Sequence, residues 1–532
     1  MNNAVDIAIV GSGFAGSLLA MIARRLGRSV ALIERGRHPR FVIGESSTPL
    51  ANLLLEELAQ RYDLPQIASL SKWGTWQRNH PDIACGLKRG FTFFHHEFGR
   101  TFEPQQDRAN ELLVAASPHD GIADTHWYRS DFDHFFVKQA QALSVEYFDE
   151  VALRSASFDA DTAVLDGERN GKPFSIQAQF VVDATGPRGF LHRALGLAEA
   201  PFKHLPATQG LYSHFRDVRL FREGSTDAES EAPPYPPDDA AIHHVFDGGW
   251  IWVLRFNNGI TSAGAAVTDK LANELKLSEG AAAWERLLSR LPAVREQFSD
   301  AKPTMPFVHS ARLSFRSSVV ADPRWALLPS AAGFIDPLLS TGFPLTLLGV
   351  DRLARSLAET GNAAELGARL ETYSRQTTDE LLAAERLVAA LYANMDDFPI
   401  FSALSLLYFA AASFSETARR LGKPDLAPSF LLHNQTSFGP KLKNCCELAL
   451  SRQVNGNLSE GDRSELLVSL MAAIEPIDVA GLSDGTRRNW HPVLASDLLA
   501  AAAKLGVDRA AICALLERCG FNCQADSKPA LD

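Results

Sequence analysis

The stretch DIAIVGSGFAGSLLAMIARRLGRSVALIERG, residues 6–36, specifies the topology of the N-terminal part of the chain. It runs from an apolar segment through three glycines into a helical pattern, and then into a second apolar segment. Gly11 permits a tight turn, Gly13 lets the backbone approach a pyrophosphate, and Gly16 lets helix and strand pack closely. The stretch therefore predicts a dinucleotide-binding unit of strand, glycine loop, helix and strand, with the pyrophosphate at the helix N-terminus.

Neighbouring residues complete this predicted nucleotide site. Phe14 and Ala15 stand between the second and third glycines, at the expected start of the helix. Glu34 ends the second apolar segment and is followed by Arg35. An acidic residue at that place accepts hydrogen bonds from the ribose hydroxyls of the adenosine. We therefore include all four residues among the cofactor-binding positions.

Two later motifs favour FAD over NAD. The stretch RSDFDHFFVKQAQAL, residues 129–143, begins with Arg129 and opens an amphipathic helical pattern. The stretch FVVDATGPRG, residues 180–189, ends a buried strand, and Gly186 lets its backbone approach the nucleotide closely. Both motifs recur, in this order after the glycine loop, in flavoproteins of the hydroxylase type. Arg129, Ala184 and Gly186 are therefore predicted to bind FAD.

Composition and charge exclude several classes of protein. The chain has 532 residues, of which 46% are hydrophobic and 22% charged, as in ordinary soluble globular proteins. The formal net charge of −11 argues against a nucleic-acid partner, because phosphate backbones are held by clustered Lys and Arg. The six cysteines have no paired metal-ligand spacing, so we expect buried thiols and no metal site.

The sequence shows no predicted export signal or transmembrane segment. The N-terminal residues MNNAVDIAIVGSG have neither a charged leader nor a cleavage site. The longest apolar run, FSALSLLYFAAASF at residues 401–414, is shorter than the roughly 20 residues that span a bilayer. We expect a buried helix there, with an interfacial helix as the alternative, and a cytoplasmic protein.

Four further stretches resemble the flavin-dependent halogenases, and they follow the family's order. GESSTPLANLLLEEL (44–58) is similar to the Gly-Glu-Ser loop along the flavin, and GLKRGFTFF (86–94) to the Lys-Arg-Gly-Ala-Thr-Phe segment of phenol and polyketide halogenases. GGWIWVLRFNNGITSAGAAV (248–267) resembles the Gly-Trp-x-Trp-x-Ile-Pro stretch, and SAAGFIDPLLSTG (330–342) resembles the segment with the acid-Pro pair and the halide site. The resemblance covers about residues 4–358, and it is closer to phenol, pyrrole and polyketide members than to tryptophan members.

The resemblance implies a specific chemistry. FADH2 from a separate NAD(P)H-dependent flavin reductase reacts with O2 to a flavin hydroperoxide, and chloride or bromide attacks it to give hypohalous acid. Lys88 then delivers the halogen to an electron-rich phenol, pyrrole or polyketide-like substrate, either free or tethered to a carrier protein. Desolvation lowers the pKa of a lysine and so supplies free amine. The alternative for Lys88 is a solvated surface lysine, and Lys72 is the rival catalytic lysine.

The same resemblance implies further site residues. Thr341 and Gly342 are placed at the halide, where backbone N–H groups at a helix N-terminus suit an anion that must stay nucleophilic. Asp336 and Gly342 are also placed at the flavin. The implied flavin loop is Gly44, Glu45, Ser46 and Ser47, and the implied substrate pocket is Phe91, Phe93, His95, Trp250 and Trp252.

Departures from the family pattern keep alternatives open. Leu339 stands where tryptophan halogenases have a Glu, which argues against free tryptophan as the substrate. Leu254 and Arg255 stand where the family has Ile-Pro, a stretch thought to keep the activated flavin from reaching the substrate directly. The first alternative is therefore an FAD-dependent hydroxylase or alkene reductase that uses no halide. A flavin-binding interaction protein is the second.

The sequence predicts an α/β fold in three parts. An FAD-binding, doubly wound (Rossmann-like) domain contains an inserted β-sheet domain for the substrate, and a helical C-terminal domain follows. Residues 222–240, rich in Pro and acidic residues, are predicted to be a mobile excursion. The predicted boundaries are 1–90, 120–200 and 311–358 for the FAD-binding domain, 91–119 and 201–310 for the substrate domain, and 359–532 for the C-terminal domain.

Overall fold

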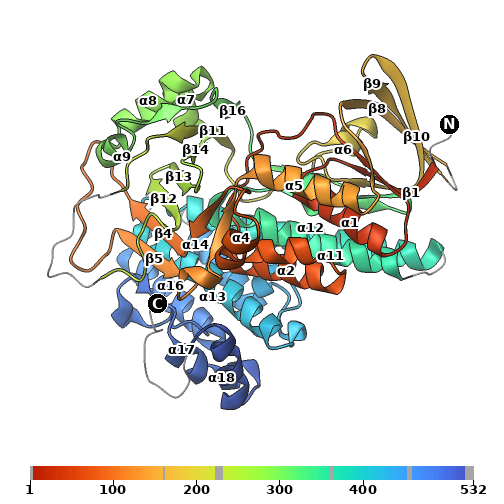
Figure 1. Ribbon diagram of the computed structural model, residues 1–532. Coiled ribbons are helices and arrows are strands. Elements are labelled where there is room, and N and C mark those ends of the chain that lie inside the picture. The colour runs from red at the N-terminus through yellow and green to blue at the C-terminus, as the bar shows by residue number, and fades with distance from the viewer. Residues whose placement is uncertain (1–3, 160–161, 222–231, 360–362, 452–457, 522–532) are drawn as a thin grey trace.

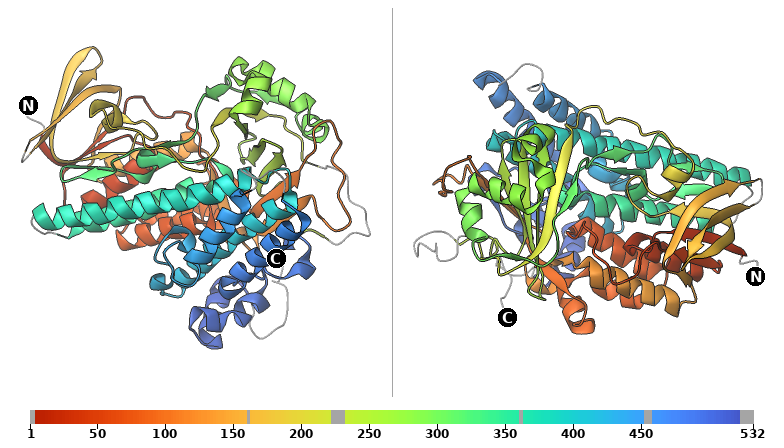
Figure 2. Two further views of the ribbon diagram at one scale, coloured as in Figure 1. Left: turned by 180° about the vertical axis from the view of Figure 1, so that it is seen from behind. Right: turned by 90° about the horizontal axis from the view of Figure 1, so that it is seen from above.

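The computed structural model describes residues 4–159, 162–221, 232–359, 363–451 and 458–521. Figure 1 shows two β-sheets at opposite ends of the molecule with helices packed against them, and Figure 2 shows the same arrangement from behind and from above. The chain's N-terminus lies at the end that carries the first sheet.

The first sheet carries the glycine loop. Its strands are β1 (Ala4–Val10), β2 (Val30–Ile33), β7 (Glu146–Phe148), β8 (Val151–Phe158), β9 (Ala163–Arg169), β10 (Lys172–Asp183), β18 (Ala321–Asp322) and β19 (Trp325–Leu327). Their order is β18-β19-β10-β1-β2-β7, and β9 and β8 continue from β10 as antiparallel strands. The pairs β1-β2, β1-β10, β2-β7 and β10-β19 are parallel. The predicted doubly wound α/β unit is confirmed, because parallel neighbours require crossover connections.

Helices surround this sheet. Helix α1 connects β1 to β2, and its residues from Phe14 to Ala23 are all buried. A continuous apolar helix surface of this kind belongs inside an α/β core rather than at its edge. The helices of this part are α1 (Phe14–Arg25), α2 (Pro49–Arg61), α3 (Pro65–Ala68), α4 (Trp73–Asn79), α5 (Arg129–Ala142), α6 (Phe190–Ala194), α10 (Pro329–Ala332) and α11 (Gly342–Ala358).

The second sheet is the predicted inserted sheet. Its strands are β4 (Gly90–His95), β5 (Glu111–Ala115), β11 (Thr208–Arg216), β12 (Ala241–Phe246), β13 (Gly249–Arg255), β14 (Thr261–Thr268), β15 (Lys302–Pro303), β16 (Val308–Ser310) and β21 (Trp490–His491). Their order is β15-β11-β14-β13-β12-β4-β5-β21, with β16 also on β11. Neighbours are antiparallel except β12 with β4 and β21 with β5, which are parallel.

The two faces of the second sheet pack against different helices. Alternate side chains point to opposite faces, so Phe91 and Phe93 belong to one apolar cluster while Phe94 belongs to another. The Phe94 face is covered by α7 (Asp269–Leu275), α8 (Ala281–Ser289) and α9 (Pro292–Gln297), which Figure 1 shows above the sheet. The opposite face packs against α13 (Phe398–Arg420), where the Phe409 ring lies 4.8 Å from that of Phe91.

Two short ribbons connect the sheets. One is β3 (Cys85–Lys88) with β6 (Asp124–Trp127), and the other is β17 (Phe315–Arg316) with β20 (Gly333–Phe334). The stretch 86–94 is therefore divided between two elements, because β3 ends at Lys88 and β4 begins at Gly90. A Cβ at Gly90 would lie 2.3 Å from the carbonyl oxygen of Val114, so the close approach of β4 to β5 at this point requires glycine.

The C-terminal part is helical, as predicted. Its helices are α12 (Ala363–Tyr392), α13, α14 (Gly439–Leu450), α16 (Glu460–Ile474), α17 (Ala495–Ala500) and α18 (Arg509–Arg518). One of the described helices, α13, is long and apolar enough to cross a membrane, and 83% of its most apolar window is buried within the protein. It contains the run 401–414, so the predicted buried helix is confirmed.

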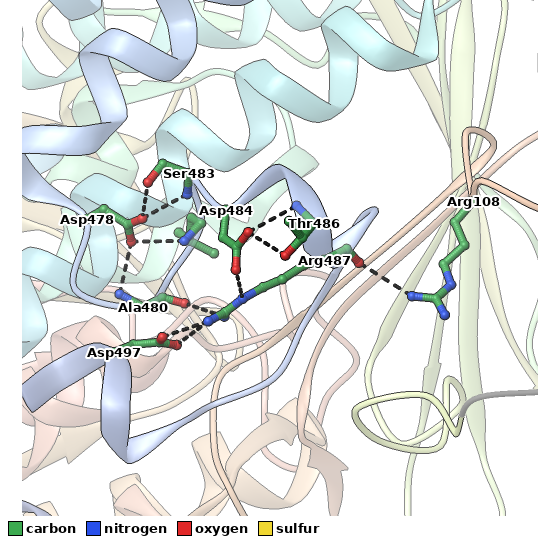
Figure 3. Close-up of polar contacts among 9 residues, drawn as sticks. Arg108, Asp478, Ala480, Ser483, Asp484, Thr486, Arg487 and Asp497 are labelled. Atoms are coloured by element: carbon green, nitrogen blue, oxygen red, sulfur yellow. Dashed lines mark hydrogen bonds and ion pairs between the residues drawn. The ribbon is translucent and has the colours of Figure 1, made fainter. Parts of the chain in front are cut away.

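A strand that the sequence does not predict ties the C-terminal part to the second sheet. Trp490 and His491 form β21 beside β5, and the Arg108 guanidinium lies 3.6 Å over the Trp490 ring. Figure 3 shows the loop that leads to it: Arg487 contacts both carboxylate oxygens of Asp497, at 2.6 and 2.8 Å. A strand of two residues leaves no alternating pattern, so only the tertiary contact defines it.

The predicted excursion at residues 222–240 lies mostly outside the described residues. Within 232–240, Tyr235 is buried, and its hydroxyl donates to the carbonyl oxygen of Phe91 at 2.6 Å. This part of the stretch is therefore packed on β4.

Candidate functional site

The glycine loop joins β1 to α1 at the carboxyl end of the first sheet. Gly11 has a φ of +101°, and a Cβ there would lie 2.6 Å from the carbonyl oxygen of Ala184. A Cβ at Gly16 would lie 2.0 Å from the carbonyl oxygen of Gly11. Gly13 is the N-cap of α1. Glycine is therefore required at positions 11 and 16 by packing, and the loop brings backbone N–H groups to a helix N-terminus, as a phosphate site needs.

Glu34 is buried at the end of the second strand and accepts several hydrogen bonds. Its Oε2 accepts from the backbone N and the hydroxyl of Ser12, at 3.1 and 2.9 Å, and lies 3.1 Å from Arg40 Nη2. Burial alone would raise the pKa of Glu34, but Arg40 and the hydrogen bonds from Gly36 and Ser12 lower it below its usual range. The carboxylate is therefore held ionised. Arg35, which follows it, is exposed.

Arg129 joins three segments around the start of α1. Its Nε and Nη2 donate to the two carboxylate oxygens of Asp133, both at 2.8 Å, and its Nη1 donates to the carbonyl oxygen of Gly44 at 2.9 Å. Asp133 also accepts from the backbone N of Phe14 at 3.2 Å. The glycine loop, the loop at Gly44 and α5 are thus held at one place, as the predicted shared role of Arg129 and Gly44 requires.

The loop from Gly44 to Ser47 docks on β6 as an irregular third strand. The carbonyl oxygen of Glu45 accepts from Trp127 N at 2.6 Å, and Ser47 donates its N and Oγ to the carbonyl oxygen of Thr125 at 3.3 and 2.7 Å. The Glu45 carboxylate is buried, and its Oε1 lies 2.9 Å from Nε2 of His214 on β11. The loop therefore bridges the first domain and the second sheet.

Two glycines of the predicted site border open space. A Cβ added at Gly186 or at Gly342 would meet no heavy atom within 4 Å, and Gly342 is exposed at the start of α11. The next residue, Phe343, stacks on Trp127 with ring centroids 4.4 Å apart and lies 5.1 Å from the Phe14 ring. The N-termini of α1 and α11 are therefore neighbours, which brings the glycine loop and the predicted halide segment together.

The segment before α11 has an unusual backbone. Leu339 and Ser340 have φ values of +62° and +55°, a region that residues other than glycine rarely adopt. Thr341, which is buried, then serves as the N-cap of α11 without a side-chain capping bond. Strain of this kind persists where the surrounding structure enforces it, and it is concentrated at binding sites. The Leu339 side chain is fully buried in the main apolar cluster.

Asp336 faces the protein interior. Its Oδ1 accepts from Trp250 Nε1 at 3.2 Å and from Leu338 N at 2.9 Å, and its Oδ2 accepts from the Tyr392 hydroxyl at 2.8 Å. The carboxylate thus connects β13, α12 and the segment before α11. In the structure its hydrogen-bond donors come from the protein, which the sequence did not indicate.

Lys88 is fully buried at the end of β3. Its Nζ donates to the hydroxyl of Ser46 at 2.8 Å and to the carbonyl oxygen of Ser47, and it lies 3.7 Å from the centre of the Phe91 ring. Burial lowers the pKa of Lys88 to about 7, although Asp124 acts in the opposite direction. The alternative of a solvated surface lysine is wrong.

The rival lysine has a different environment. Lys72 lies 3.0 Å from the Glu56 carboxylate, and both side chains are partly exposed. Lys72 therefore lacks the burial that lowers the pKa of Lys88.

The aromatic residues of the predicted substrate pocket line one face of the second sheet. The Phe91 and Phe93 rings lie 6.5 Å apart on β4, and Trp250 and Trp252 lie 5.6 Å apart on β13, with β12 between the two strands. All four are buried. The sequence did not indicate His243, whose ring stacks between Phe93 at 4.4 Å and Trp250 at 5.2 Å.

His95 lies away from this group, at the other end of β4 from Lys88. It lines an open cavity of about 540 Å³ beside the start of α13, together with Asn110, Asp396, Phe398 and Arg463. The structure therefore brings Lys88, Phe91, Phe93 and the tryptophans together but separates His95 from them. Within the residues that the structure describes, no group of three or more His, Cys, Asp or Glu side chains could hold a metal ion.

Several residues of the site were missed at the level of sequence. Asp133 had a signal, because it follows Arg129 by four residues and such pairs meet on a helix. His214 and Asp124 had none, since their partners are distant in the sequence, and Arg40 had none because it follows Glu34 by six residues in an irregular loop, a spacing without periodicity.

The cradle fits FAD. The glycine loop and α1 suit a pyrophosphate, Glu34 suits a ribose, and Gly186 and Gly342 each border open space. This geometry defines a flavin-dependent oxidoreductase. The chain matches the model of the family described as FAD dependent oxidoreductase over residues 6–305, more than half of its length, and it belongs to that family.

Its relatives narrow the class further. The chain is 27% identical over 417 residues to the monodechloroaminopyrrolnitrin halogenase PrnC of Pseudomonas fluorescens, covering 76% of this chain and 71% of that protein. It is 27% identical over 418 residues to the tetracycline 7-halogenase of Kitasatospora aureofaciens, covering 76% and 73%. The predicted resemblance to flavin-dependent halogenases is confirmed.

The fold agrees with solved structures of halogenases. The crystal structure of halogenase PltM in complex with phloroglucinol and FAD matches with a TM-score of 0.79 at 23% sequence identity, covering 91% of this chain and 99% of that one. The match includes the C-terminal helices, beyond the part in which the sequence resemblance could be recognised.

Proposed function

We propose that the protein is a halogenase that uses FADH2 and O2 to install chloride or bromide on an electron-rich aromatic substrate. The single observation that carries the proposal is the place of Lys88. Its amine is fully buried, is hydrogen-bonded to the flavin loop through Ser46, and lies against the aromatic face at Phe91. An amine between a flavin loop and an apolar aromatic wall is suited to carrying a halogen from one to the other.

The cofactor would be held by the residues predicted for it. These are the glycine loop, Glu34, Arg35, Arg129, the loop from Gly44 to Ser47, Ala184, Gly186, Asp336 and the start of α11 at Gly342. Reduced FAD, when bound, supplies the two electrons for O2 to oxidise a halide, so that one oxygen atom ends in hypohalous acid and the other in water. The protein's part is to exclude solvent and to place Lys88, since hypohalous acid that escapes reacts without selectivity.

The halide is proposed to bind at the N-terminus of α11. Thr341 and Gly342 begin that helix, Gly342 borders open space, and the positive end of a helix attracts anions. The left-handed backbone at Leu339 and Ser340 supports this assignment, because it turns the chain so that the helix begins there.

The substrate is proposed to be a phenol, a pyrrole or a polyketide-like aromatic. The relatives include halogenases of pyrrole-2-carbonyl groups on a peptidyl-carrier protein, as well as the tetracycline halogenase. The buried aromatic face at Phe91, Phe93, Trp250 and Trp252 suits a flat ring. Leu339, with its buried side chain, supplies no carboxylate for an indole nitrogen.

The proposal includes the partners and boundaries predicted from the sequence. A separate NAD(P)H-dependent flavin reductase supplies FADH2, and the substrate is free or tethered to a carrier protein. The protein acts in the cytoplasm. The FAD-binding, substrate-binding and C-terminal domains keep the predicted boundaries.

The test is halogenation with matched lysine variants. Wild type, Lys88→Ala and Lys72→Ala are incubated with FAD, a flavin reductase, NADH, bromide and a panel of phenols and pyrroles. Mass spectrometry then detects monobrominated product. We expect Lys88→Ala to lose at least about 100-fold in rate, which is the contribution that a positioned acid or base group makes to a rate. Lys72→Ala should keep the wild-type rate.

Lys88→Ala must still bind FAD for the comparison to hold, and the change in flavin fluorescence measures this binding. Full halogenation by Lys88→Ala would exclude the role of that lysine. A wild type that gives only hydroxylated product would make the protein a hydroxylase, and a wild type without turnover would favour the interaction protein.

A further inference from the structure

A buried carboxylate lies opposite Lys88. In the antiparallel ribbon of β3 and β6, Lys88 pairs directly with Asp124. Side chains directly opposite each other in a ribbon point to the same face, with Cβ atoms about 5 Å apart. Both side chains are buried, and Lys88 has no exposed surface. The ribbon therefore places the two residues opposite each other in the interior, although Lys88 Nζ itself donates to Ser46 and Ser47 and not to Asp124.

The Lys88 side chain extends over β6. The flavin loop docks on the far side of β6, where Ser46 bridges to His126 and Ser47 N donates to Thr125 O at 3.3 Å. Lys88 starts from β3 and donates to Ser46 Oγ at 2.8 Å, so its chain must cross the strand that carries Asp124. The amine thus reaches the flavin loop by passing the carboxylate.

Only one of the two carboxylate oxygens of Asp124 accepts a hydrogen bond from a neutral group. Its Oδ1 accepts from Asn52 Nδ2 at 2.8 Å, while its Oδ2 is buried without a hydrogen-bond partner among the described residues. An ionised carboxylate in such a place is costly unless a cation is near or unless it takes up a proton. A cation or a proton is therefore needed at Asp124.

The other titratable groups around Lys88 and Asp124 either form an ion pair with each other or are neutral. Helix α13 presents Glu416 and Arg420 toward Asp124, and these two bind each other at 2.8 Å. His126 on β6 and His243 on β12 face Lys88, and burial, aided by Lys88, lowers the pKa of each so that the imidazoles are neutral near pH 7. Lys88 is therefore the cation whose charge acts on Asp124, without a direct hydrogen bond between the two groups.

We propose that Asp124 is a positioning residue whose protonation is coupled to that of Lys88. The inference rests on the proposed role of Lys88 in halogen transfer. In one form the pair is an ammonium and a carboxylate. In the other the N–H bond breaks, its electron pair stays on nitrogen, and an O–H bond forms on Asp124, leaving a free amine and a carboxylic acid. Both forms have no net charge, so the amine is released without a change of charge in the interior.

The electrostatic environment supports this pairing. Burial lowers the pKa of Lys88 to about 7, and burial raises the pKa of Asp124 to about 7. Because the charge of each group acts on the other, their titration belongs to the pair and not to either residue alone. The free amine is the form that bonds to halogen, giving N–X and water from hypohalous acid.

The first test is the pH dependence of halogenation by Asp124→Asn. Asn keeps the shape and the acceptor for Asn52 but removes the negative charge, so the Lys88 ammonium becomes costlier and loses its proton at lower pH. We expect the pH–rate profile to move to lower pH by about one unit or more, as removal of a nearby opposite charge does. Asp131→Asn, which changes a half-buried carboxylate on α5, is the control and keeps the wild-type profile.

The profile distinguishes positioning from a merely structural role. A loss of rate that is equal at every pH, with the profile in place, would overturn the proposal. FAD binding by fluorescence is measured for each variant, so that a failure to bind the cofactor is recognised separately.

The second test does not depend on halogenation. The melting temperatures of FAD-loaded wild type, Lys88→Met, Asp124→Asn and the double variant form a cycle. Each single variant leaves one buried charge without its counter-charge, whereas the double variant leaves none. We therefore expect the melting temperature of the double variant to fall by less than the sum of the two single decreases. Additive losses would exclude the pair even in an active halogenase. If the decrease in the double variant is smaller than that sum but the wild type does not halogenate, the coupling of Lys88 and Asp124 stands and the proposed function is excluded.

Discussion

Asp336 is a residue whose ionisation is set by the fold. It is fully buried and accepts hydrogen bonds from Leu338 N, Tyr392 and Trp250. Burial raises its pKa from 3.8 to about 6, and these hydrogen bonds offset only part of that rise. The folded protein therefore holds a proton on Asp336 between about pH 4 and pH 6, where the unfolded chain has released it.

This difference makes a prediction about pH and stability. Because the folded state binds more protons than the unfolded state in that window, the contribution of Asp336 to stability falls as pH rises from 4 to 6 and stays low above it. The shift corresponds to on the order of 3 kcal/mol. We expect Asp336→Asn, which does not titrate, to gain stability relative to wild type as pH rises. Melting temperatures from pH 4.5 to 7.5 check this, and a constant difference between the two proteins would contradict it.

The residues of the site were predictable where a local motif specifies them. Gly11, Gly13 and Gly16 lie as expected because one local strand, loop and helix motif places them, although Gly11 also packs closely on Ala184. The burial of Lys88 was not predictable, since it comes from the packing of β6 and the flavin loop, which are distant in the sequence. Arg40, the partner of Glu34, was missed because the irregular loop that carries it has no periodicity, and Arg35 was chosen because it is the neighbour in sequence.

Between elements, a buried ion pair links the flavin domain to the C-terminal part. Arg352 on α11 donates two hydrogen bonds to Glu380 on α12, both at 2.6 Å, and Glu380 also accepts from Phe430 N at 2.8 Å. The two side chains are 16% and 2% exposed. Because α11 begins at the proposed halide site, this pair fixes the helix that presents the site.

We predict that Glu380→Gln destabilises the protein by about 3–5 kcal/mol, because it leaves the Arg352 charge buried and unpaired. Gln retains an acceptor for Phe430 N, so the loss reports the charge. Glu168→Gln is the matched control, since its pair with Arg154 is 73% and 43% exposed and such pairs contribute less than about 1 kcal/mol. Denaturant unfolding of the three proteins measures both changes, and equal losses in the two variants would refute the difference.

The elements themselves differ in how far their sequences determine them. The unit from β1 to β2 has a strong pattern and forms as predicted, and the apolar run at 401–414 forms the buried α13. Strand β21 could not be predicted, because two residues carry no periodicity and its place depends on the edge of β5. The division of residues 86–94 between β3 and β4 likewise depends on the tertiary contact at Gly90.

At the scale of the whole molecule, the C-terminal part closes the aromatic face of the second sheet. Helix α13 lies across that face, with Phe409 4.8 Å from Phe91 and Phe401 5.8 Å from Phe93. Phe91 in turn lies 3.7 Å from Lys88 Nζ. The space available to a ring beside Lys88 is thus limited by a helix that comes from the far end of the chain.

This closure predicts that α13 sets the size of the substrate, on the basis of the proposed function. Phe409→Ala removes a ring from the wall opposite Phe91, so we expect the ratio of kcat/KM for a two-ring phenol to that for a one-ring phenol to rise by about tenfold or more. The same change costs about 3–5 kcal/mol of stability, as loss of a buried ring does. Phe298→Ala is the matched control, because Phe298 is equally buried, 6% exposed, and packs against Phe215 on the opposite face of the sheet. Both variants should lose stability, but only Phe409→Ala should change the substrate ratio. A ratio that changes equally in both, or in neither, would show that the aromatic face does not hold the substrate.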